Sequence, residues 1–281
     1  TQVFLNADDP QVNYLGKFVK KKYYFGLDEK IMETDQIPHD VDSVYCPNCN
    51  NKMDYKIISY SHLGIYQCKK CKYKRSTPNK IEDLNYPLAG MYNQYNTIAA
   101  ATALNVAFSL SFQKINKSLE NFEPAFGRQE KINYKGKSIY ILLSKNPTGF
   151  NQSIKVLEEL SGNSKNNVLI VLNDRIPDGR DISWIWDVEF ENLLKKTRNI
   201  FLSGDRVFDM ALRMKYAFTN NPDVLTSNKI ISLDNILVIE KLKDAISIAS
   251  EKTSGNQSLF ILPTYSAMLQ VRKIISGREI M

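Results

Sequence analysis

The second half of the chain carries short apolar runs that alternate with amphipathic stretches. Short apolar strands followed by amphipathic helices are typical of a mainly parallel sheet covered by helices on both faces. This half is therefore predicted to be a Rossmann-like α/β domain, in which further strand and helix pairs continue to residue 275. The first predicted strands are 138–143, 168–172 and 199–203, and the first predicted helices are 152–160, 189–196 and 208–216.

The first half of the chain shows a shorter version of the same alternation. Residues 3–5 and 22–26 are predicted strands, and the helix-like stretch 11–18 between them suits a βαβ layout. Two more helices are predicted, at 96–108, where small residues permit close packing, and at about 115–122. Because residues 124–130 separate the two halves, we divide the chain into residues 1–126 and 127–281.

All four cysteines fall into two CxxC pairs in the first half. The pairs are Cys46-Pro-Asn-Cys49 and Cys68-Lys-Lys-Cys71, and the 18 residues between them give the spacing of a four-thiolate zinc site. Alternating apolar positions in residues 53–66 predict a hairpin that joins two metal-binding knuckles. We therefore predict a zinc ribbon inserted at about residues 42–77, with Cys46, Cys49, Cys68 and Cys71 as ligands of a structural Zn²⁺.

Two other interpretations of the cysteines remain open at this point. A disulfide or redox pair is disfavoured in a reducing compartment. Lysines and an arginine surround the second pair with tyrosines between them, a pattern also found in ribbons that grip nucleic-acid backbones. A basic face on a small ribbon is usually only solvated, so we expect no nucleic-acid partner. The residues concerned are Lys69, Lys70, Lys72, Lys74, Arg75, Tyr66 and Tyr73.

The composition indicates a globular chain with an excess of positive charge. Hydrophobic residues make up 43% and charged residues 24%, enough apolar material for a sizeable core, and the formal net charge is +7. Such a charge suits an anionic partner, for example a nucleotide, a pyrophosphate or a membrane surface. No stretch approaches the roughly 18–20 apolar residues of a membrane-spanning helix, so we expect a cytoplasmic protein that is not transmembrane. Because the chain opens at Thr1 and enters a strand at once, we expect it to be a fragment.

Three short motifs, in this order along the chain, resemble the Mur ligases. They are residues 5–10 (LNADDP), 92–96 (YNQYN) and 126–130 (FGRQE). Within that superfamily the inserted ribbon, residues 145–150 (KNPTGF) and residues 178–187 (DGRDISWIWD) resemble the MurT family. The resemblance covers essentially the whole chain. It implies a partial Mur ligase central, ATP-binding domain with an inserted zinc ribbon in residues 1–126, and a C-terminal Mur-ligase/MurT domain in residues 127–281.

The resemblance also implies an activity. MurT-type subunits pair with a glutaminase subunit, GatD, which frees ammonia from glutamine. With ATP and Mg²⁺ they phosphorylate the α-carboxylate of D-isoglutamate in the stem peptide of lipid II, and ammonia displaces the phosphate to leave D-isoglutamine. A carboxylate is a poor electrophile until it carries such a leaving group, and a shielded route keeps the intermediate from water. The chain would therefore be a carbon–nitrogen ligase of peptidoglycan biosynthesis that works at the inner membrane surface.

Five residues are implied in nucleotide binding. Asn93 and Asn96 match asparagines that lie at the adenine side of the site in Mur ligases, although Asn96 is equally suited to cap a helix. Arg128 matches a phosphate or ribose contact, with an interdomain salt bridge as its alternative. Lys145 and Asn146 occupy a segment that contacts the nucleotide in other Mur ligases.

The segment around Lys145 departs from the Mur ligase pattern. Leu142 stands where other members have an aspartate, and Lys145 stands where they have a histidine. The usual ribose contact is therefore not carried over, and we predict that Lys145 meets phosphate instead. The alternative is a plain strand-to-helix turn in which Gly149 permits an unusual backbone conformation.

Asp181 and Asp187 are the predicted catalytic residues. By the resemblance, an aspartate of this chain orients the glutaminase subunit's histidine and completes a Cys-His-Asp triad across the interface. Asp181 is preferred, while Asp178 and Asp187 are close competitors. The alternative is that Asp178 and Gly179 form a turn and that Asp181 caps a helix.

The aromatic and histidine residues near these motifs allow more than one interpretation. Trp184 and Trp186 suit either the core or an interface, where tryptophans are good anchors. His39 and His62 are the only histidines, and we interpret both as incidental because no nucleophile or metal-ligand spacing surrounds them. The chain therefore has no means of building a Cys-His hydrolase alone.

One motif that a Mur ligase needs is missing from the sequence. No GxxxxGK[ST] phosphate loop occurs in the 281 residues, so we expect this loop and the magnesium-binding residues to lie upstream and the chain alone to be inactive. Two alternative functions remain: a zinc-ribbon module that binds nucleic acid, and a Mur-type ligase that adds an amino acid rather than ammonia.

Overall fold

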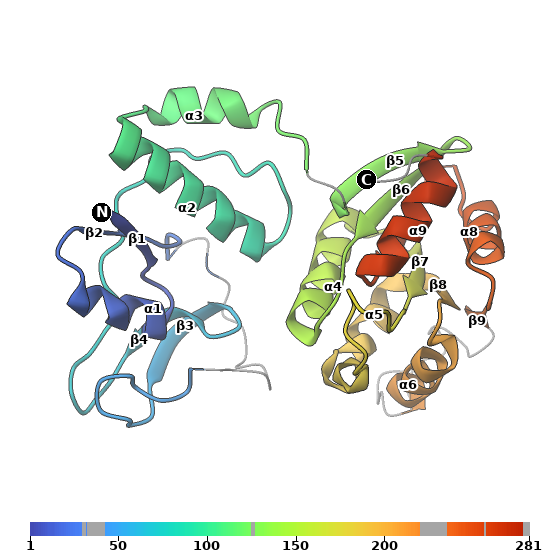
Figure 1. Cartoon of the computed structure of the whole chain (residues 1–281), viewed down its shortest axis with the longest axis horizontal. Helices are drawn as coiled ribbons and strands as arrows, with labels where there is room; N and C mark the ends of the chain where they lie inside the picture. The colour runs from blue at the N-terminus through green and yellow to red at the C-terminus, as the bar shows by residue number, and fades with distance from the viewer. Residues whose placement is uncertain (30–31, 33–42, 125–126, 220–234, 256, 278–281) are drawn as a thin grey trace. The chain divides into compact units, whose positions relative to one another are not determined.

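The structure is a computed structural model in which the chain divides into two compact units. Residues 30–31, 33–42, 125–126, 220–234, 256 and 278–281 lie outside the described part (Figure 1). The units are Thr1–Glu123 and Pro124–Met281, and each is described by itself. The division falls three residues before the boundary predicted from the sequence. No helix in the described ranges is long and apolar enough to cross a membrane.

The first unit begins with the expected βαβ arrangement. Strand β1 (Val3–Asn6) pairs in parallel with β2 (Lys22–Phe25). Helix α1 (Pro10–Leu15) and the 3-10 turn η1 (Gly16–Phe18) connect them. The helix starts at Pro10 because proline fits the first helical position and the Asp9 carboxylate accepts hydrogen bonds from the amides of Gln11 and Val12.

The ribbon hairpin is formed by β3 (Asp54–Tyr60) and β4 (Leu63–Gln67), which pair antiparallel as predicted. Gly64 is required in β4, because a Cβ there would lie 2.1 Å from the carbonyl oxygen of Ile57. The hairpin lies against the core of the first unit through Leu63, which packs with Leu27, Tyr95 and Ile98.

Two helices complete the first unit. Helix α2 (Met91–Phe108) starts five residues earlier than predicted, after Gly90 at φ 87°, and α3 (Phe112–Leu119) is capped by Ser111. The early start corrects one interpretation of Asn96, which lies within the helix and does not cap it. The sequence did not reveal this start because the first turn holds polar and aromatic residues without a capping side chain.

The second unit contains a six-stranded sheet in the order β5-β6-β10-β7-β8-β9 among the residues described. All neighbouring pairs are parallel except β5 with β6. The strands are β5 (Arg128–Tyr134), β6 (Lys137–Leu142), β7 (Asn166–Val171), β8 (Thr197–Ser203), β9 (Ile236–Val238) and β10 (Ser258–Pro263). The predicted mainly parallel sheet is confirmed. The antiparallel strand β5 was missed because it is polar and lies at the sheet edge.

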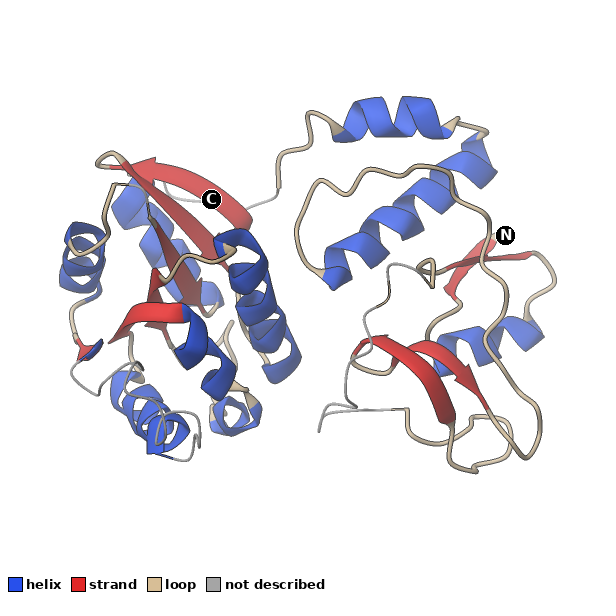
Figure 2. Ribbon diagram, turned by 180° about the vertical axis from the view of Figure 1, so that it is seen from behind, coloured by secondary structure: helices blue, strands red, loops and turns tan. Residues whose placement is uncertain are grey.

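Helices cover both faces of this sheet (Figure 2). Ala245, Ile246, Ala267 and Met268, from two of the helices, pack on one face against alternate residues of the central strands, such as Ile261. On the other face, the rings of Phe150 and Phe190 meet edge to face at 5.0 Å. The helices are α4 (Pro147–Ser161), α5 (Phe190–Lys196), α6 (Val207–Thr219), α8 (Leu242–Glu251) and α9 (Tyr265–Ser276).

Candidate functional site

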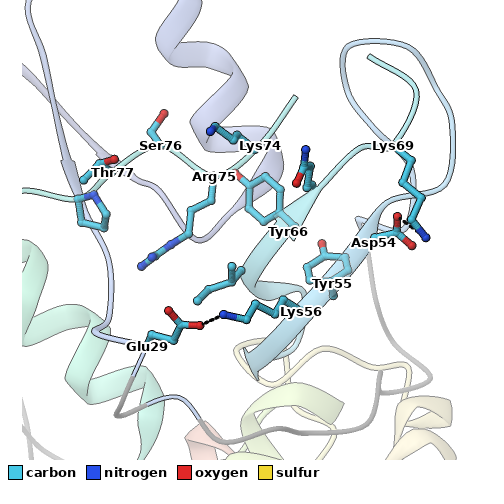
Figure 3. A pocket seen from close by; sticks show the side chains of 13 residues that line it. Glu29, Asp54, Tyr55, Lys56, Tyr66, Lys69, Lys74, Arg75, Ser76 and Thr77 are labelled. Atoms are coloured by element: carbon cyan, nitrogen blue, oxygen red, sulfur yellow. Dashed lines mark hydrogen bonds and ion pairs between the residues drawn. The ribbon is translucent and has the colours of Figure 1, made fainter. Parts of the chain in front are cut away.

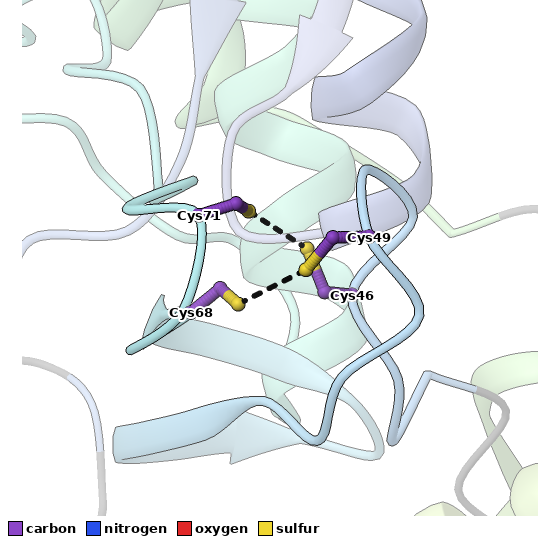
Figure 4. Close-up of side chains that lie close together, drawn as sticks. All are labelled: Cys46, Cys49, Cys68 and Cys71. Atoms are coloured by element: carbon purple, nitrogen blue, oxygen red, sulfur yellow. Dashed lines mark hydrogen bonds between the residues drawn. The ribbon is translucent and has the colours of Figure 1, made fainter.

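The four cysteines meet at the end of the ribbon hairpin (Figure 4). Their Sγ atoms all lie within 4.8 Å of one another, and the pairs Cys46–Cys71 and Cys49–Cys68 are 3.6 Å apart. A tetrahedral zinc site with Zn–S bonds of about 2.3 Å places its sulfurs about 3.8 Å apart, so the cluster fits Zn²⁺. A disulfide needs about 2.05 Å, and all four cysteines are free. The geometry therefore favours the zinc interpretation over the disulfide.

The two CxxC segments have the same backbone hydrogen bonds. The amide of Asn50 donates to the Cys46 carbonyl at 2.8 Å, and the amide of Lys72 donates to the Cys68 carbonyl at 3.0 Å. Asn50 and Lys72 also share a left-handed backbone, with φ of 57° and 61°. Each segment is thus a tight knuckle that directs two sulfurs to one point, because the left-handed residue turns the chain away directly after the second cysteine.

Protonation differs among the thiols. Burial raises the pKa of Cys46 to about 12, whereas a hydrogen bond from the Asn48 side chain lowers the pKa of Cys71 to about 6. Zinc binds thiolates, so binding requires that the protons leave and stabilises the fold most at neutral or higher pH. Four thiolates would leave no open coordination position, so a zinc ion held by these cysteines would have a structural role.

A second buried cluster lies beside the ribbon, around Asp8. Its carboxylate accepts hydrogen bonds from Nε of Arg75 at 2.6 Å, the amide of Leu27 at 2.9 Å and the Tyr95 hydroxyl at 2.7 Å. Asp8 is fully buried, and burial raises the pKa of its carboxyl although Arg75 opposes the rise. Arg75 also donates to the Leu27 carbonyl at 2.7 Å. The cluster therefore ties the segment that leaves the ribbon to the loop after β1.

His62 has a partner that the sequence did not reveal. Its Nε2 lies 3.3 Å from the Asp9 carboxylate, so His62 holds the hairpin tip against the start of α1. Burial opposes ionisation of Asp9, but His62 and the amides of Val12 and Gln11 together lower its pKa. The interpretation of His62 as incidental was wrong in this respect, while His39 lies outside the described residues.

A hollow of about 530 Å³ lies on the ribbon (Figure 3). Lys56 pairs with Glu29, and Lys69 lies 3.1 Å from Asp54, so two of its lysines are matched by acids. Lys74, Ser76 and Thr77 line the other side. The hollow is thus polar but only weakly biased towards an anion.

The predicted adenine contacts both lie within α2. Asn93 is buried, and its side-chain amide donates to the Ala89 carbonyl at 2.7 Å. Asn96, on the next turn, is exposed. The buried side chain is fixed and the exposed one is accessible, but a base contact for either remains a prediction.

Arg128, Lys145 and Asn146 lie in the second unit, near the carboxyl end of β6. Arg128 pairs with Leu142 across the antiparallel strands, and Lys145 and Asn146 follow β6 directly. Arg128 and Lys145 are exposed. The Asn146 side chain caps α4 by accepting from the amide of Gly149 at 2.7 Å. Two cations beside a helix N-terminus suit a phosphate group, which supports the nucleotide role without testing it.

Gly149 rules out part of the alternative considered for this segment. It lies inside α4 and is absent from the glycines with positive φ, so the unusual backbone conformation of that alternative does not occur. Its role is spatial: a Cβ would come within 2.9 Å of the Asn146 carboxamide oxygen that caps the helix. A glycine here therefore leaves room for the cap.

The three aspartates of residues 178–187 have different surroundings. Asp178 binds the start of α9: its carboxylate accepts from the Ser266 amide at 2.7 Å and from the Ser266 hydroxyl at 2.5 Å. Asp181 is exposed and accepts from the Ser183 amide at 2.8 Å, which lowers its pKa and keeps it ionised at neutral pH. Asp187 is exposed at the end of the 3-10 turn η2 (Ser183–Asp187).

An arginine that the sequence analysis did not identify binds the backbone of the turn η2. Arg213 of α6 is buried and donates to the carbonyls of Ile185 and Val188, at 3.2 and 2.6 Å. It also pairs with Glu191 at 3.0 Å. These bonds fix the backbone at Ile185 and Val188, on either side of the exposed Asp187.

Of the two roles considered for the tryptophans, core and interface, each tryptophan suits a different one. Trp184 packs on Phe150 of the core, with ring centroids 6.2 Å apart. Trp186 is 48% exposed and meets Tyr216 of α6 edge to face at 5.6 Å. Trp186 is therefore the better placed of the two tryptophans to contact another molecule.

Replacing Asp178 with alanine is expected to destabilise the second unit by about 1–2 kcal/mol, because the first turn of α9 loses its partly buried acceptor. The free energy of unfolding from urea titration measures this change. Asp187→Ala is the matched control on the same segment and should leave the urea midpoint almost unchanged. Equal effects of the two variants would contradict the capping role.

Comparison with known proteins agrees with this geometry. Residues 143–268 match the family described as MurT ligase C-terminal. The chain is 34% identical over 241 residues to the MurT subunit of lipid II isoglutaminyl synthase (glutamine-hydrolyzing) from Staphylococcus aureus (strain COL). That match covers 80% of this chain and 54% of the relative. This chain belongs to the MurT family.

A second MurT-family relative and two solved structures extend the comparison. The corresponding MurT subunit of Streptococcus pneumoniae is 28% identical, covering 99% of this chain and 62% of that protein. A pseudomurein peptide ligase type C from Methanothermus fervidus superposes with a TM-score of 0.62 at 22% identity, covering 98% of this chain and 56% of that one. MurF from Acinetobacter baumannii superposes with a TM-score of 0.57 at 16% identity, covering 98% of this chain and 51% of that one. The predicted Mur-ligase-like α/β fold is confirmed, and the chain spans about half the length of these relatives.

Proposed function

We propose that this MurT-family chain forms the synthetase subunit of an ATP-dependent ligase of peptidoglycan biosynthesis, which amidates D-isoglutamate in lipid II with ammonia from a glutaminase subunit. The observation that carries the proposal is the match of residues 143–268 together with the exposed, ionised Asp181, whose carboxylate accepts from the Ser183 amide. The relatives are subunits of glutamine-hydrolyzing lipid II isoglutaminyl synthases, which supports the reaction class proposed here.

Asp181 is proposed to act on the glutaminase partner. A carboxylate beside a histidine ring fixes the tautomer and stabilises the imidazolium while a cysteine attacks glutamine. Such a carboxylate must be ionised, exposed and held in place, and Asp181 meets these conditions. Asp178 does not, because Ser266 occupies its carboxylate. Asp187 remains the competitor.

Residues for nucleotide binding are proposed in each unit, and each set is considered by itself. Bound ATP with Mg²⁺ would supply the phosphoryl group that activates the substrate carboxylate. Arg128 and Lys145 would pair with phosphate oxygens, and the N-terminus of α4 beside Asn146 would add its dipole. Asn93 and Asn96 would contact the base. The same proposal places the reaction at the cytoplasmic surface of the membrane, where the enzyme reaches its lipid-linked substrate.

The test is an amidation assay with the full-length protein, a glutaminase subunit, lipid II, ATP and Mg²⁺, run with either glutamine or ammonium. Asp181→Asn is expected to lower the glutamine-dependent rate by about a hundredfold or more and to leave the ammonium-dependent rate unchanged. Asp187→Asn on the same turn is the matched comparison. Normal activity of Asp181→Asn with glutamine would remove Asp181 from the triad, and a loss confined to Asp187→Asn would transfer the role to that residue.

The ammonium arm also separates the reaction classes. Product formed only when an amino acid replaces ammonia would identify a ligase that adds an amino acid, and would contradict the amidation proposal.

A further inference from the structure

The end of α1, the turn η1 and the second zinc knuckle form an exposed surface that the proposed function leaves unused. Leu15 is 56% exposed and Phe18 is 74% exposed, only three residues apart. Four lysines near them are exposed as well. We call this surface the basic cap, and it comprises Leu15, Phe18, Lys20, Lys21, Lys70 and Lys72.

The parts of the basic cap are joined by specific contacts. The Tyr73 hydroxyl, next to Lys72, donates to the Pro10 carbonyl at 2.8 Å, and its ring lies edge to face with Tyr14 at 5.9 Å. Lys17 donates to the Asn48 side chain at 2.6 Å and lies 4.4 Å from the centre of the Tyr14 ring. The turn and the knuckles therefore form one rigid surface, and Phe18 is presented from it rather than from a loose loop.

The charge of the chain is concentrated in the two segments that build this surface. Residues 10–26 and 55–80 contain no aspartate or glutamate. Their eleven cationic residues exceed the net charge of +7, so the remainder of the chain is net negative. These cations are Lys17, Lys20, Lys21, Lys22, Lys56, Lys69, Lys70, Lys72, Lys74, Arg75 and Lys80.

We propose that the basic cap docks the protein on an anionic lipid bilayer. Phe18 and Leu15 enter the boundary between head groups and acyl chains, and the lysines face the lipid phosphates. Lysines near an anionic membrane are attracted electrostatically to the lipid phosphates. Apolar side chains in such a patch add favourable free energy because the membrane buries them away from water. Neither contribution alone holds a protein on a membrane, but the cap combines both.

A membrane explains the apolar part of the cap better than a nucleic acid does. A nucleic acid would use the lysines equally well and would stack bases on an exposed aromatic ring. Leu15 has no face for stacking, yet it is exposed beside Phe18. A bilayer accepts aliphatic and aromatic side chains alike. This proposal stands on the surface itself and does not rest on the amidation activity.

Sedimentation with vesicles of equal parts phosphatidylglycerol and phosphatidylcholine tests the docking. The zinc-loaded full chain should bind these vesicles, and it should bind pure phosphatidylcholine much more weakly. Phe18→Ser should lose about tenfold in affinity through the lost burial, and Lys20→Glu/Lys21→Glu should lose at least about tenfold through charge. All these side chains are exposed, so zinc content and thermal unfolding should stay at wild-type values.

Matched substitutions in the second unit serve as controls. Phe208→Ser removes another exposed phenylalanine, 64% exposed against 74% for Phe18, and Lys241→Glu/Lys243→Glu reverses the charge of two exposed lysines. Both should bind vesicles as the wild type does. Controls that lose as much affinity as the cap variants would overturn the proposal, because binding would then follow overall charge or apolar content.

Insertion is tested separately by fluorescence. Phe18→Trp should be quenched by lipids brominated on their acyl chains beyond the background of Trp184 and Trp186 in the wild type. Absence of this extra quenching would overturn the proposal. Binding of single-stranded nucleic acid that the cap variants abolish, without vesicle binding, would overturn it in favour of a nucleic-acid surface.

Discussion

Cys68→Ser is expected to release zinc and unfold the ribbon while the second unit keeps its fold. Cys68 is fully buried and packs with Cys46, Met53 and Tyr66 in a small apolar cluster. This packing depends on closed knuckles, because two of the four residues are cysteines of the metal site. Structural zinc contributes on the order of 10 kcal/mol to the folding of small zinc modules, so loss of one ligand has a large effect. Zinc content by metal analysis and near-ultraviolet circular dichroism measure the change.

The zinc prediction has a control on the same knuckle. Lys70→Ser alters an exposed residue between Cys68 and Cys71 and should retain one zinc ion per chain with an unchanged melting temperature. A chelator should reproduce the effect of Cys68→Ser on the wild type, and zinc should be released as the pH falls because the thiolates become protonated. A Cys68→Ser chain that keeps its zinc and its melting temperature would show that the site is not structural.

The second large effect is expected at the buried pair of Asp8 and Arg75. Asp8→Ala leaves the Arg75 guanidinium without its carboxylate and the Tyr95 hydroxyl and Leu27 amide without their acceptor. Breaking a buried pair by removing one partner costs about 3–5 kcal/mol. Arg75→Met should cost a similar amount, measured as the free energy of unfolding of the first unit in urea.

A double-mutant cycle distinguishes this pair from an ordinary ion pair. Burial already raises the pKa of Asp8, which shows that the ionised carboxylate bears a desolvation cost in the fold. The double variant should therefore cost less than the sum of the two single variants. Asp54→Ala and Lys69→Met, an exposed pair on the same ribbon 3.1 Å apart, should each cost less than about 1 kcal/mol. Additive costs at Asp8 and Arg75 would contradict the coupling.

The nucleotide residues illustrate a limit of local reasoning. Asn96 was considered as a helix N-cap because it precedes an alanine-rich run. The helix instead begins at Met91, after Gly90, about one and a half turns before Asn96. Gly149 suggested a strained turn, yet the structure uses it to leave space for the Asn146 cap. In both cases the residue type suited several local conformations, and contacts elsewhere in the unit selected one.

Periodicity and spacing in the sequence alone predicted the alternation of strands and helices along the second unit, the βαβ start of the chain and the four-cysteine ribbon. The order of the strands in the sheet came only from the structure. The predicted features depend on residues close to one another in the chain, where alternation and CxxC spacing translate directly into a buried face or a metal knuckle. The resemblance to the MurT family likewise came from short motifs in a fixed order.

Only the tertiary structure decided the features that join distant residues. Arg75 reaches Asp8 across 67 positions, and Asp178 meets Ser266 across 88. Arg213 supports η2 from a helix 25 residues after Val188. These contacts distinguish Asp8 and Asp178, whose carboxylates bind residues far along the chain, from the exposed Asp181. No local pattern encodes them, because a carboxylate's role depends on which groups the fold brings to it.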